Sequence, residues 1–400
     1  MTSAAVPLND TASLPLAEQA DDTRFAPTTR DLALIALVAV LLRVFITVLS
    51  PHVPHEPAPF AHGPLWMYAY WGDGPSYLAQ ARAMCGDASH LTDFDKRVFP
   101  GFPALIALVH TITRIPFEYA ALLIPWLSAG IAAAATAVFF TDRRLGWAMA
   151  LLIPHYLSYS SMPMSEAPLL AFTAGGILVA RRHGMLPALI GGVLLGVAGM
   201  IRPVAAFAVV GFFCYDLYRR RHLEAWTFAI AAAVIVGAGI EAMHLWTHGD
   251  ALHGVHVYAT DKAAYDGQLF TWPFHSLLST PHRPDLPYLK KGKIAYIWIH
   301  VVLALTACAI LARRVLADYK TRGPIARLDV LCLPWLAFNT LFVLCVGSKW
   351  GFFAFPRFVV PAMPAAFWAY RRILPNRWWA WLVIAMISVV IAVDSVKRMN

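Results

Sequence analysis

Residues 32–50 of this chain read Leu-Ala-Leu-Ile-Ala-Leu-Val-Ala-Val-Leu-Leu-Arg-Val-Phe-Ile-Thr-Val-Leu-Ser. An apolar block of this length is what a helix needs to cross about 30 Å of hydrocarbon. Further blocks of roughly 15 to 22 residues follow along the chain, and they lack the period-two alternation that is typical of membrane β-barrels. The sequence therefore predicts an all-α, polytopic membrane protein.

The composition agrees with this fold class. Hydrophobic side chains make up 59% of the 400 residues and charged ones only 14%, whereas soluble domains are about 25% charged. No soluble domain or internal repeat is visible, so residues 31–400 are predicted to form one integral-membrane domain after a disordered cytoplasmic tail at 1–30. We expect about eleven membrane spans, at residues 32–50, 118–140, 145–161, 166–181, 185–201, 203–217, 225–246, 294–312, 328–347, 355–371 and 377–394.

The net charge of +9 is distributed as in a membrane protein. Its basic residues gather between the spans, which is typical of cytoplasmic loops that face anionic lipid. This pattern argues against nucleic acid as a partner and indicates a multi-pass protein, of the inner (plasma) membrane if the source is bacterial. The clusters are Arg143-Arg144, Arg181-Arg182, Arg219-Arg220-Arg221, Arg313-Arg314 with Lys320 and Arg322, and Arg371-Arg372.

With these clusters inside, two segments at 51–117 and 247–293 face outward and hold most of the unusual polar and aromatic residues. The first contains a short apolar block at 101–114, which we expect to lie along the outer leaflet because it is too short to cross. Loops held by a rigid helical scaffold often carry the functional residues. The two outer segments are therefore the predicted functional loops.

The first outer segment reads Trp71-Gly-Asp-Gly-Pro-Ser-Tyr77. One interpretation makes Asp73 the cap of a helix that begins near Pro75. The other makes it a general base at the membrane face, which takes a proton from an acceptor hydroxyl while a phosphate-linked group departs. The aromatic residues Trp71 and Tyr77 suit either an interfacial belt or stacking on a sugar ring.

Glu166 is the second carboxylate predicted on this side. It stands at the outer start of a span, where a carboxylate is favoured by the helix N-terminus. The turn before it is rich in aromatic and hydroxyl groups, including His155, Tyr156 and Tyr159, and is expected to line a polar cavity. Asp73 and Glu166 therefore form a pair of candidate catalytic carboxylates.

Four cations are also predicted outside, namely Arg97, Arg202, Lys349 and Arg357. A charged group at membrane depth needs a partner. The partner is either a structural one, namely Asp73, Glu166 or loop carbonyl groups, or the phosphate or pyrophosphate of a lipid, where charge develops as a bond breaks. Both alternatives remain open from the sequence.

Histidines are frequent in the outer segments, and His253 with His256 shows a spacing of three residues, as does His52 with His55. No HExxH or equivalent frame accompanies them, so no metal site is predicted. The sequence requires no cofactor, and a divalent metal stays possible.

Several short motifs resemble those of the GPI mannosyltransferase 2 (PIG-V-like) family, which belongs to the GT-C class of polyprenyl-phosphate-sugar-dependent glycosyltransferases. The similarity follows the family's order across roughly residues 40–370. The motifs are Trp71-Gly-Asp73 with Tyr77-Leu-Ala, Val98-Phe-Pro-Gly-Phe-Pro-Ala-Leu105, Ser160-Ser-Met-Pro-Met-Ser-Glu166-Ala-Pro, Ala198-Gly-Met-Ile-Arg202-Pro and Pro356-Arg357-Phe-Val-Val-Pro-Ala-Met-Pro.

The resemblance implies a membrane enzyme that transfers a hexose from a polyprenyl-phosphate carrier on the outer face, with mannose as the first candidate for the sugar. It implies inversion at the sugar, with Asp73 as the base and Arg202 or Arg357 against the phosphate. The expected partners are thus a lipid-linked sugar donor and membrane lipids. The alternatives are a transporter or lipid flippase, which uses the same charges as a substrate path, and a non-catalytic subunit of a membrane complex.

Overall fold

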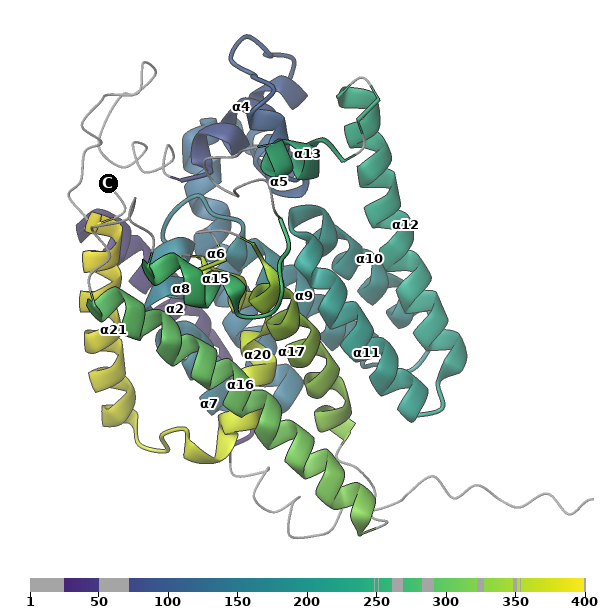
Figure 1. Cartoon of the computed structure of the whole chain (residues 1–400), viewed down its shortest axis with the longest axis vertical. Helices are drawn as coiled ribbons and strands as arrows, with labels where there is room; N and C mark the ends of the chain where they lie inside the picture. Colours follow the sequence, from purple (N-terminus) through teal and green to yellow (C-terminus); the bar gives the residue numbers. More distant parts are fainter. Residues whose placement is uncertain are drawn as a thin grey trace, which may run out of the picture.

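The computed structural model describes residues 25–49, 72–247, 249–250, 252–260, 269–282, 291–321, 327–347, 351–352 and 354–398. These residues are helical apart from their connections and one isolated bridge between Phe270 and Val346 (Figure 1). The longer helices are α2 (Thr29–Leu49), α5 (Gly101–Thr113), α6 (Phe117–Phe140), α9 (Glu166–Ala180), α10 (Met185–Ile201), α11 (Ala206–Tyr218), α12 (His222–Trp246), α16 (Lys291–Lys320), α17 (Arg327–Cys345) and α21 (Trp378–Arg398).

Hydropathy and length agree with a membrane protein. In the described part of the chain α2, α6, α12, α16 and α17 are each long and apolar enough to cross a membrane, and α5, α9, α10, α11 and α21 contain shorter apolar stretches. Large apolar side chains such as Leu41, Ile230 and Val390 are more than half exposed. Such faces are suited to lipid rather than water. The predicted polytopic helical fold is confirmed.

Two predicted spans are not continuous helices. The block 145–161 divides into α7 (Arg143–Leu151) and α8 (Pro154–Ser160), because Ile153 is extended and Pro154 opens the second helix. The block 355–371 divides into α19 (Phe355–Phe358), the 3₁₀ turn η5 (Val360–Ala362) and α20 (Met363–Tyr370). Prolines in that block start new turns instead of continuing one helix.

The predicted break at Arg202-Pro203 is confirmed. Arg202 is extended, with φ −154° and ψ 129°, between the end of α10 and the 3₁₀ turn η3 (Pro203–Ala205). The boundary between the predicted tail and the membrane domain at residue 30 stays a prediction, and the described part of the chain begins at Phe25. Phe25 packs under Arg144, its carbonyl accepts from the Arg143 N–H, and α2 starts at Thr29.

Glycines in α10 bring the helices around the site close together. A Cβ atom at Gly191 would lie 2.6 Å from the Gly176 carbonyl oxygen of α9, and one at Gly192 would lie 2.4 Å from the Phe228 carbonyl oxygen of α12. Small residues allow such backbone contact between membrane helices. Gly101 of α5 likewise sits against the backbone of Met200 and Ile201. The end of α10, and with it Arg202, is therefore tightly held.

The described parts of the two predicted outer segments, which the sequence presents separately, meet in space. Figure 1 shows α4 (Gly74–Met84), α5 and α13 (His253–Thr260) together at one end of the molecule, far from the turn between α11 and α12. His253 Nε2 lies 2.9 Å from the Asp93 carbonyl oxygen, and Gly254 packs on the backbone of Arg97. This contact connects α13 to the 3₁₀ turn η2 (Asp95–Arg97).

Candidate active site

Asp73 directly precedes α4 but does not cap it, because its side chain makes no capping hydrogen bond. Its carboxylate instead accepts from two arginines. Arg97 Nη2 donates to Oδ1 over 3.3 Å, and Arg357 Nη2 donates to Oδ2 over 2.9 Å. The capping interpretation of Asp73 is therefore wrong, and the carboxylate is ion-paired.

Glu166 opens α9 and its side chain is fully buried. Arg202 Nη1 donates to Glu166 Oε1 over 2.8 Å, and Arg357 Nε donates to the same oxygen. The second carboxylate oxygen, Oε2, has no hydrogen-bond partner in the described part of the chain. Both arginines thus contact the same oxygen of Glu166.

Arg357 connects the two carboxylates, which come from helices more than ninety positions apart in the sequence. Its guanidinium carbon also lies 5.4 Å from the centre of the Tyr159 ring. We call Asp73, Glu166, Arg97, Arg202 and Arg357 the arginine–carboxylate network. Three guanidinium groups against two carboxylates leave one positive charge in excess, which favours an anionic ligand.

The network fixes the protonation state of Asp73. Burial raises the pKa of this carboxyl, but the charges of Arg357, Arg202 and Arg97 outweigh that effect and lower the pKa below its usual range. Asp73 is therefore ionised at neutral pH. About 21% of its side chain stays accessible, against none of the Glu166 side chain, so Asp73 is the carboxylate that a substrate can reach.

Tyr77 is buried within the contacts that support the site. The side chain is buried, its hydroxyl donates to Ser165 Oγ over 3.2 Å, and its ring meets the Phe102 ring edge to face. These contacts join α4 to the residue before Glu166. The assignments of Tyr77 to substrate binding and of Asp73 to catalysis stay predictions, and Trp71 and Lys349 lie outside the described residues.

The turn at His155 was predicted to line a polar cavity, and the structure places a polar aromatic cluster there. The Tyr296 hydroxyl lies 2.7 Å from His155 Nδ1, and His300 Nδ1 lies 2.9 Å from the Tyr296 carbonyl oxygen. The His155 ring also approaches the Tyr159 ring, which in turn faces Arg357. Sequence reasoning missed Tyr296 and His300, since they lie on the distant helix α16.

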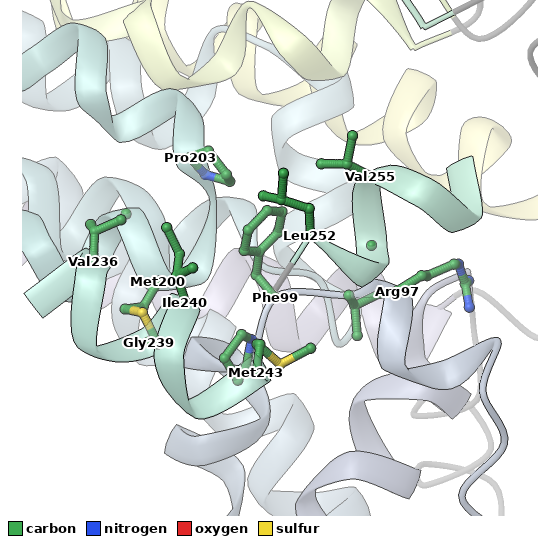
Figure 2. A pocket seen from close by; sticks show the side chains of 14 residues that line it. Arg97, Phe99, Met200, Pro203, Val236, Gly239, Ile240, Met243, Leu252 and Val255 are labelled. Carbon is green, nitrogen blue, oxygen red and sulfur yellow. The ribbon is translucent and has the colours of Figure 1, made fainter. Parts of the chain in front are cut away.

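An apolar pocket of about 270 Å³ lies beside Arg97 and Pro203. Figure 2 shows side chains from α10, α12 and α13 around it, with the Arg97 side chain extending away from them. Pro203, next to Arg202, also lines the pocket. The residues labelled are Arg97, Phe99, Met200, Pro203, Val236, Gly239, Ile240, Met243, Leu252 and Val255.

No group of three or more metal-binding side chains occurs among the residues that the structure describes. The paired histidines His253 and His256 both face Asp250, with Nδ1 to carboxylate distances of 3.3 and 2.9 Å. The spacing of three residues thus lets both histidines contact Asp250, just before α13. Among the described residues, the carboxylates of Asp73 and Glu166 contact arginines.

Comparison with known proteins identifies the fold. No family model and no curated protein matches the sequence. Among solved structures, ArnT from Cupriavidus metallidurans, crystallised with undecaprenyl phosphate, superposes with a TM-score of 0.50 at 17% identity. The two chains share a fold. The match covers 87% of this chain and 62% of ArnT, so this chain spans less than two thirds of the ArnT length.

ArnT has the polytopic GT-C fold, and the GT-C architecture expected from the motifs is therefore confirmed for this chain. The likeness concerns the fold and does not extend to the PIG-V-like family, which stays a prediction. Membership of that family rests only on the short motifs around Asp73, Glu166, Arg202 and Arg357.

Proposed function

We propose that the protein is a membrane glycosyltransferase that moves a sugar from a polyprenyl-phosphate carrier to an acceptor hydroxyl. The observation that carries this proposal is the arginine–carboxylate network, which joins a partly accessible base to an excess of positive charge. The GT-C fold supports the same function, because the ArnT structure that shares it holds undecaprenyl phosphate.

In the proposed reaction the acceptor oxygen attacks the anomeric carbon of the sugar and displaces the lipid phosphate. Asp73 takes the proton of the attacking hydroxyl, while the electron pair of the broken bond leaves with the phosphate oxygen. Arg357 and Arg202 stabilise that developing charge. Attack from the face opposite to the phosphate inverts the anomeric centre, as the motif resemblance implies.

The two interpretations of the arginines, ion pair and phosphate clamp, are then successive states of one site. Without substrate the guanidinium groups bind Asp73 and Glu166. An arriving phosphate competes for Arg357, because guanidinium binds phosphate with two parallel hydrogen bonds. Loss of Arg357 from Asp73 raises the pKa of the carboxyl, so the base strengthens once the donor is bound.

The pocket beside Arg97 accounts for the lipid part of the donor. Its lining is almost wholly apolar, and it adjoins the network through Arg97 and Pro203. Filling it with Ile240→Trp should impair transfer from long-chain carriers more than from short-chain ones. Ile230→Trp, on the same helix α12 but not among the pocket residues, is the control. Equal effects on both chain lengths would remove the pocket from the proposal.

The sugar is proposed to be a hexose, and mannose is the first candidate because of the motif resemblance. The deciding assay uses purified protein in lipid, polyprenyl-phospho-sugars as donors, and nucleotide sugars as the control. Transfer from the lipid donor alone, and its loss in Asp73→Asn, is the expected result. Transfer from nucleotide sugars, or none from any polyprenyl donor, would contradict the proposed function.

A transporter or lipid flippase is the second candidate. The helix interruptions at Ile153, at Arg202 and at Val359 favour it, since transporters bind substrates at broken helices. The same purified protein in vesicles separates the two functions. Movement of the lipid across the bilayer without chemical change of the sugar would support transport.

A further inference from the structure

Arg357 contacts both carboxylates of the network, although it lies on a helix of only four residues, α19. Its Nη2 donates to Asp73 and its Nε donates to Glu166, so these contacts use the N–H groups at the edge of the planar guanidinium. An aromatic ring attracts a guanidinium through the negative charge of the ring face and needs no carboxylate to do so. The Arg357 guanidinium carbon lies over the ring of Tyr159, 5.4 Å from its centre.

Tyr159 belongs to the polar aromatic cluster between α8 and α16. His155 and Tyr159 are four residues apart on α8 and therefore lie on one face of that helix. The ring centres of His155 and Tyr159 are 5.9 Å apart, and those of His155 and Tyr296 are 4.6 Å apart in a stacked arrangement. The Tyr296 hydroxyl also lies 2.7 Å from His155 Nδ1. A continuous series of contacts thus connects Arg357 to α16.

The helix that carries Tyr159 is also held by Arg43, a fully buried residue of α2. Pro154, the first residue of α8, lacks the N–H that would continue the helical bonding to the Ala150 carbonyl of α7. Arg43 Nη1 donates to that carbonyl over 2.7 Å, and Arg43 Nε donates to Ser160 Oγ over 2.9 Å. Arg43 therefore fixes both the break before α8 and the residue after Tyr159. A buried charge in a membrane span is costly, and this support is a reason to retain it.

We propose that Tyr159 is a positioning residue for Arg357, and that the contact between His155 and Tyr296 holds the Tyr159 ring in place. The ring keeps the guanidinium group where it reaches both carboxylates of the network. An arriving phosphate competes with those carboxylates for the N–H groups of Arg357 but not for the ring contact. Tyr159 therefore keeps Arg357 in position while its hydrogen bonds are exchanged. Where it concerns donor binding, this inference rests on the proposed function, since Arg357 is assigned there to the lipid phosphate.

Two substitutions of Tyr159 separate the ring from its hydroxyl. Tyr159→Leu should weaken binding of polyprenyl monophosphate roughly tenfold, the scale of a partly desolvated cation–π contact. Tyr159→Phe keeps the ring and should bind nearly as well as the unmodified protein. Tyr215→Leu is the matched control, because the Arg219 guanidinium carbon also lies 5.4 Å from the centre of the Tyr215 ring, at the end of α11. It should leave lipid binding unchanged. Equal binding by Tyr159→Leu and Tyr159→Phe, or an equal loss in the control, would overturn the proposal.

Fluorinated phenylalanines at position 159 separate electrostatic attraction from packing, and they keep the side-chain volume that Tyr159→Leu removes. Fluorine withdraws electrons from the ring face, so the attraction to Arg357 should weaken as fluorines are added. Affinity for polyprenyl monophosphate should fall in the same order. Packing alone predicts no such fall, because fluorine makes the side chain more apolar. Lipid affinity that is independent of ring fluorination would therefore contradict the positioning role.

The fate of the proposed function is separable from this test. If the unmodified protein fails to bind polyprenyl monophosphate, the phosphate clamp is wrong. The melting temperatures of the fluorinated series still decide whether the Tyr159 ring holds Arg357, since that contact needs no ligand. They should fall as fluorines are added, and constant or rising melting temperatures would refute the contact. Tyr296→Phe, which removes the hydroxyl beside His155, should lower the melting temperature less than Tyr159→Leu does. An unchanged melting temperature would remove the contact between His155 and Tyr296 from the proposal.

Discussion

Asp73 and Glu166 invite a comparison because both carboxylates stand at the start of a helix and both contact Arg357. They differ in access. Asp73 has part of its side chain exposed and an arginine at each oxygen, whereas Glu166 is fully buried with both arginines on one oxygen. The accessible carboxylate is suited to react, and the buried one is suited to hold the arginines in place.

Asp73→Asn should produce the largest effect on transfer. The amide keeps the size of the side chain but cannot accept the proton, so turnover should fall by about 10²-fold or more, the scale of a lost general base. Insertion and melting temperature should change little, because the side chain is partly exposed. Turnover is measured with the polyprenyl donor. An active Asp73→Asn protein would move the base assignment to Glu166.

Glu166→Gln should have its main effect on stability. Removal of this charge leaves Arg202 and Arg357 without their shared buried partner, and such a loss typically costs about 3–5 kcal/mol. We expect a low yield of folded protein and a strongly reduced melting temperature. Glu118→Gln, which breaks the Arg82–Glu118 ion pair away from the network, is the matched control. A stable but inactive Glu166→Gln protein would reverse the comparison and make Glu166 the reacting group.

Hydropathy and prolines explain how far the sequence predicts the fold. The bounds of α6 and α10 follow closely from apolar blocks, because membrane insertion depends on the same local property. The interruption after Phe358 was missed, and the turn at His155 was recognised but still included in one span at 145–161. Averaging hydropathy over a block conceals a single proline, although Pro154 and Pro361 were visible signals.

The site was predicted as a group of outer charges, but its pairings were not. Arg357 lies 284 positions after Asp73, and no local pattern specifies which of the cations contacts which carboxylate. Arg43 could have been found from the sequence. It is a charge within a predicted span, and a charge in that setting is a candidate functional residue by default.

Arginine-to-lysine substitutions compare the contributions of the individual arginines of the network to donor binding. Lysine keeps the charge of Arg357 but cannot contact Asp73 and Glu166 together through a planar fork. Donor binding should weaken by about 1–3 kcal/mol, the scale of a charged hydrogen bond. Arg202→Lys should cost less, since Arg202 contacts Glu166 alone among the two carboxylates. Arg82→Lys is the control. If the network variants lose yield but keep donor affinity, these arginines are purely structural.

The smallest expected effect is a shift in the pH dependence of transfer. Arg97 is the weakest of the three arginines that lower the pKa of Asp73, after Arg357 and Arg202. Arg97→Gln should therefore raise this pKa slightly while most of the network remains. Because the reacting form of Asp73 is the ionised one, activity is lost as pH falls through its pKa, and a raised pKa moves this loss to higher pH. The measurement is turnover against pH on the acid side, with Lys96→Gln as a control for the neighbouring exposed pair with Asp93. A shift toward lower pH, or an equal shift in both variants, would show that the acid limb does not report Asp73.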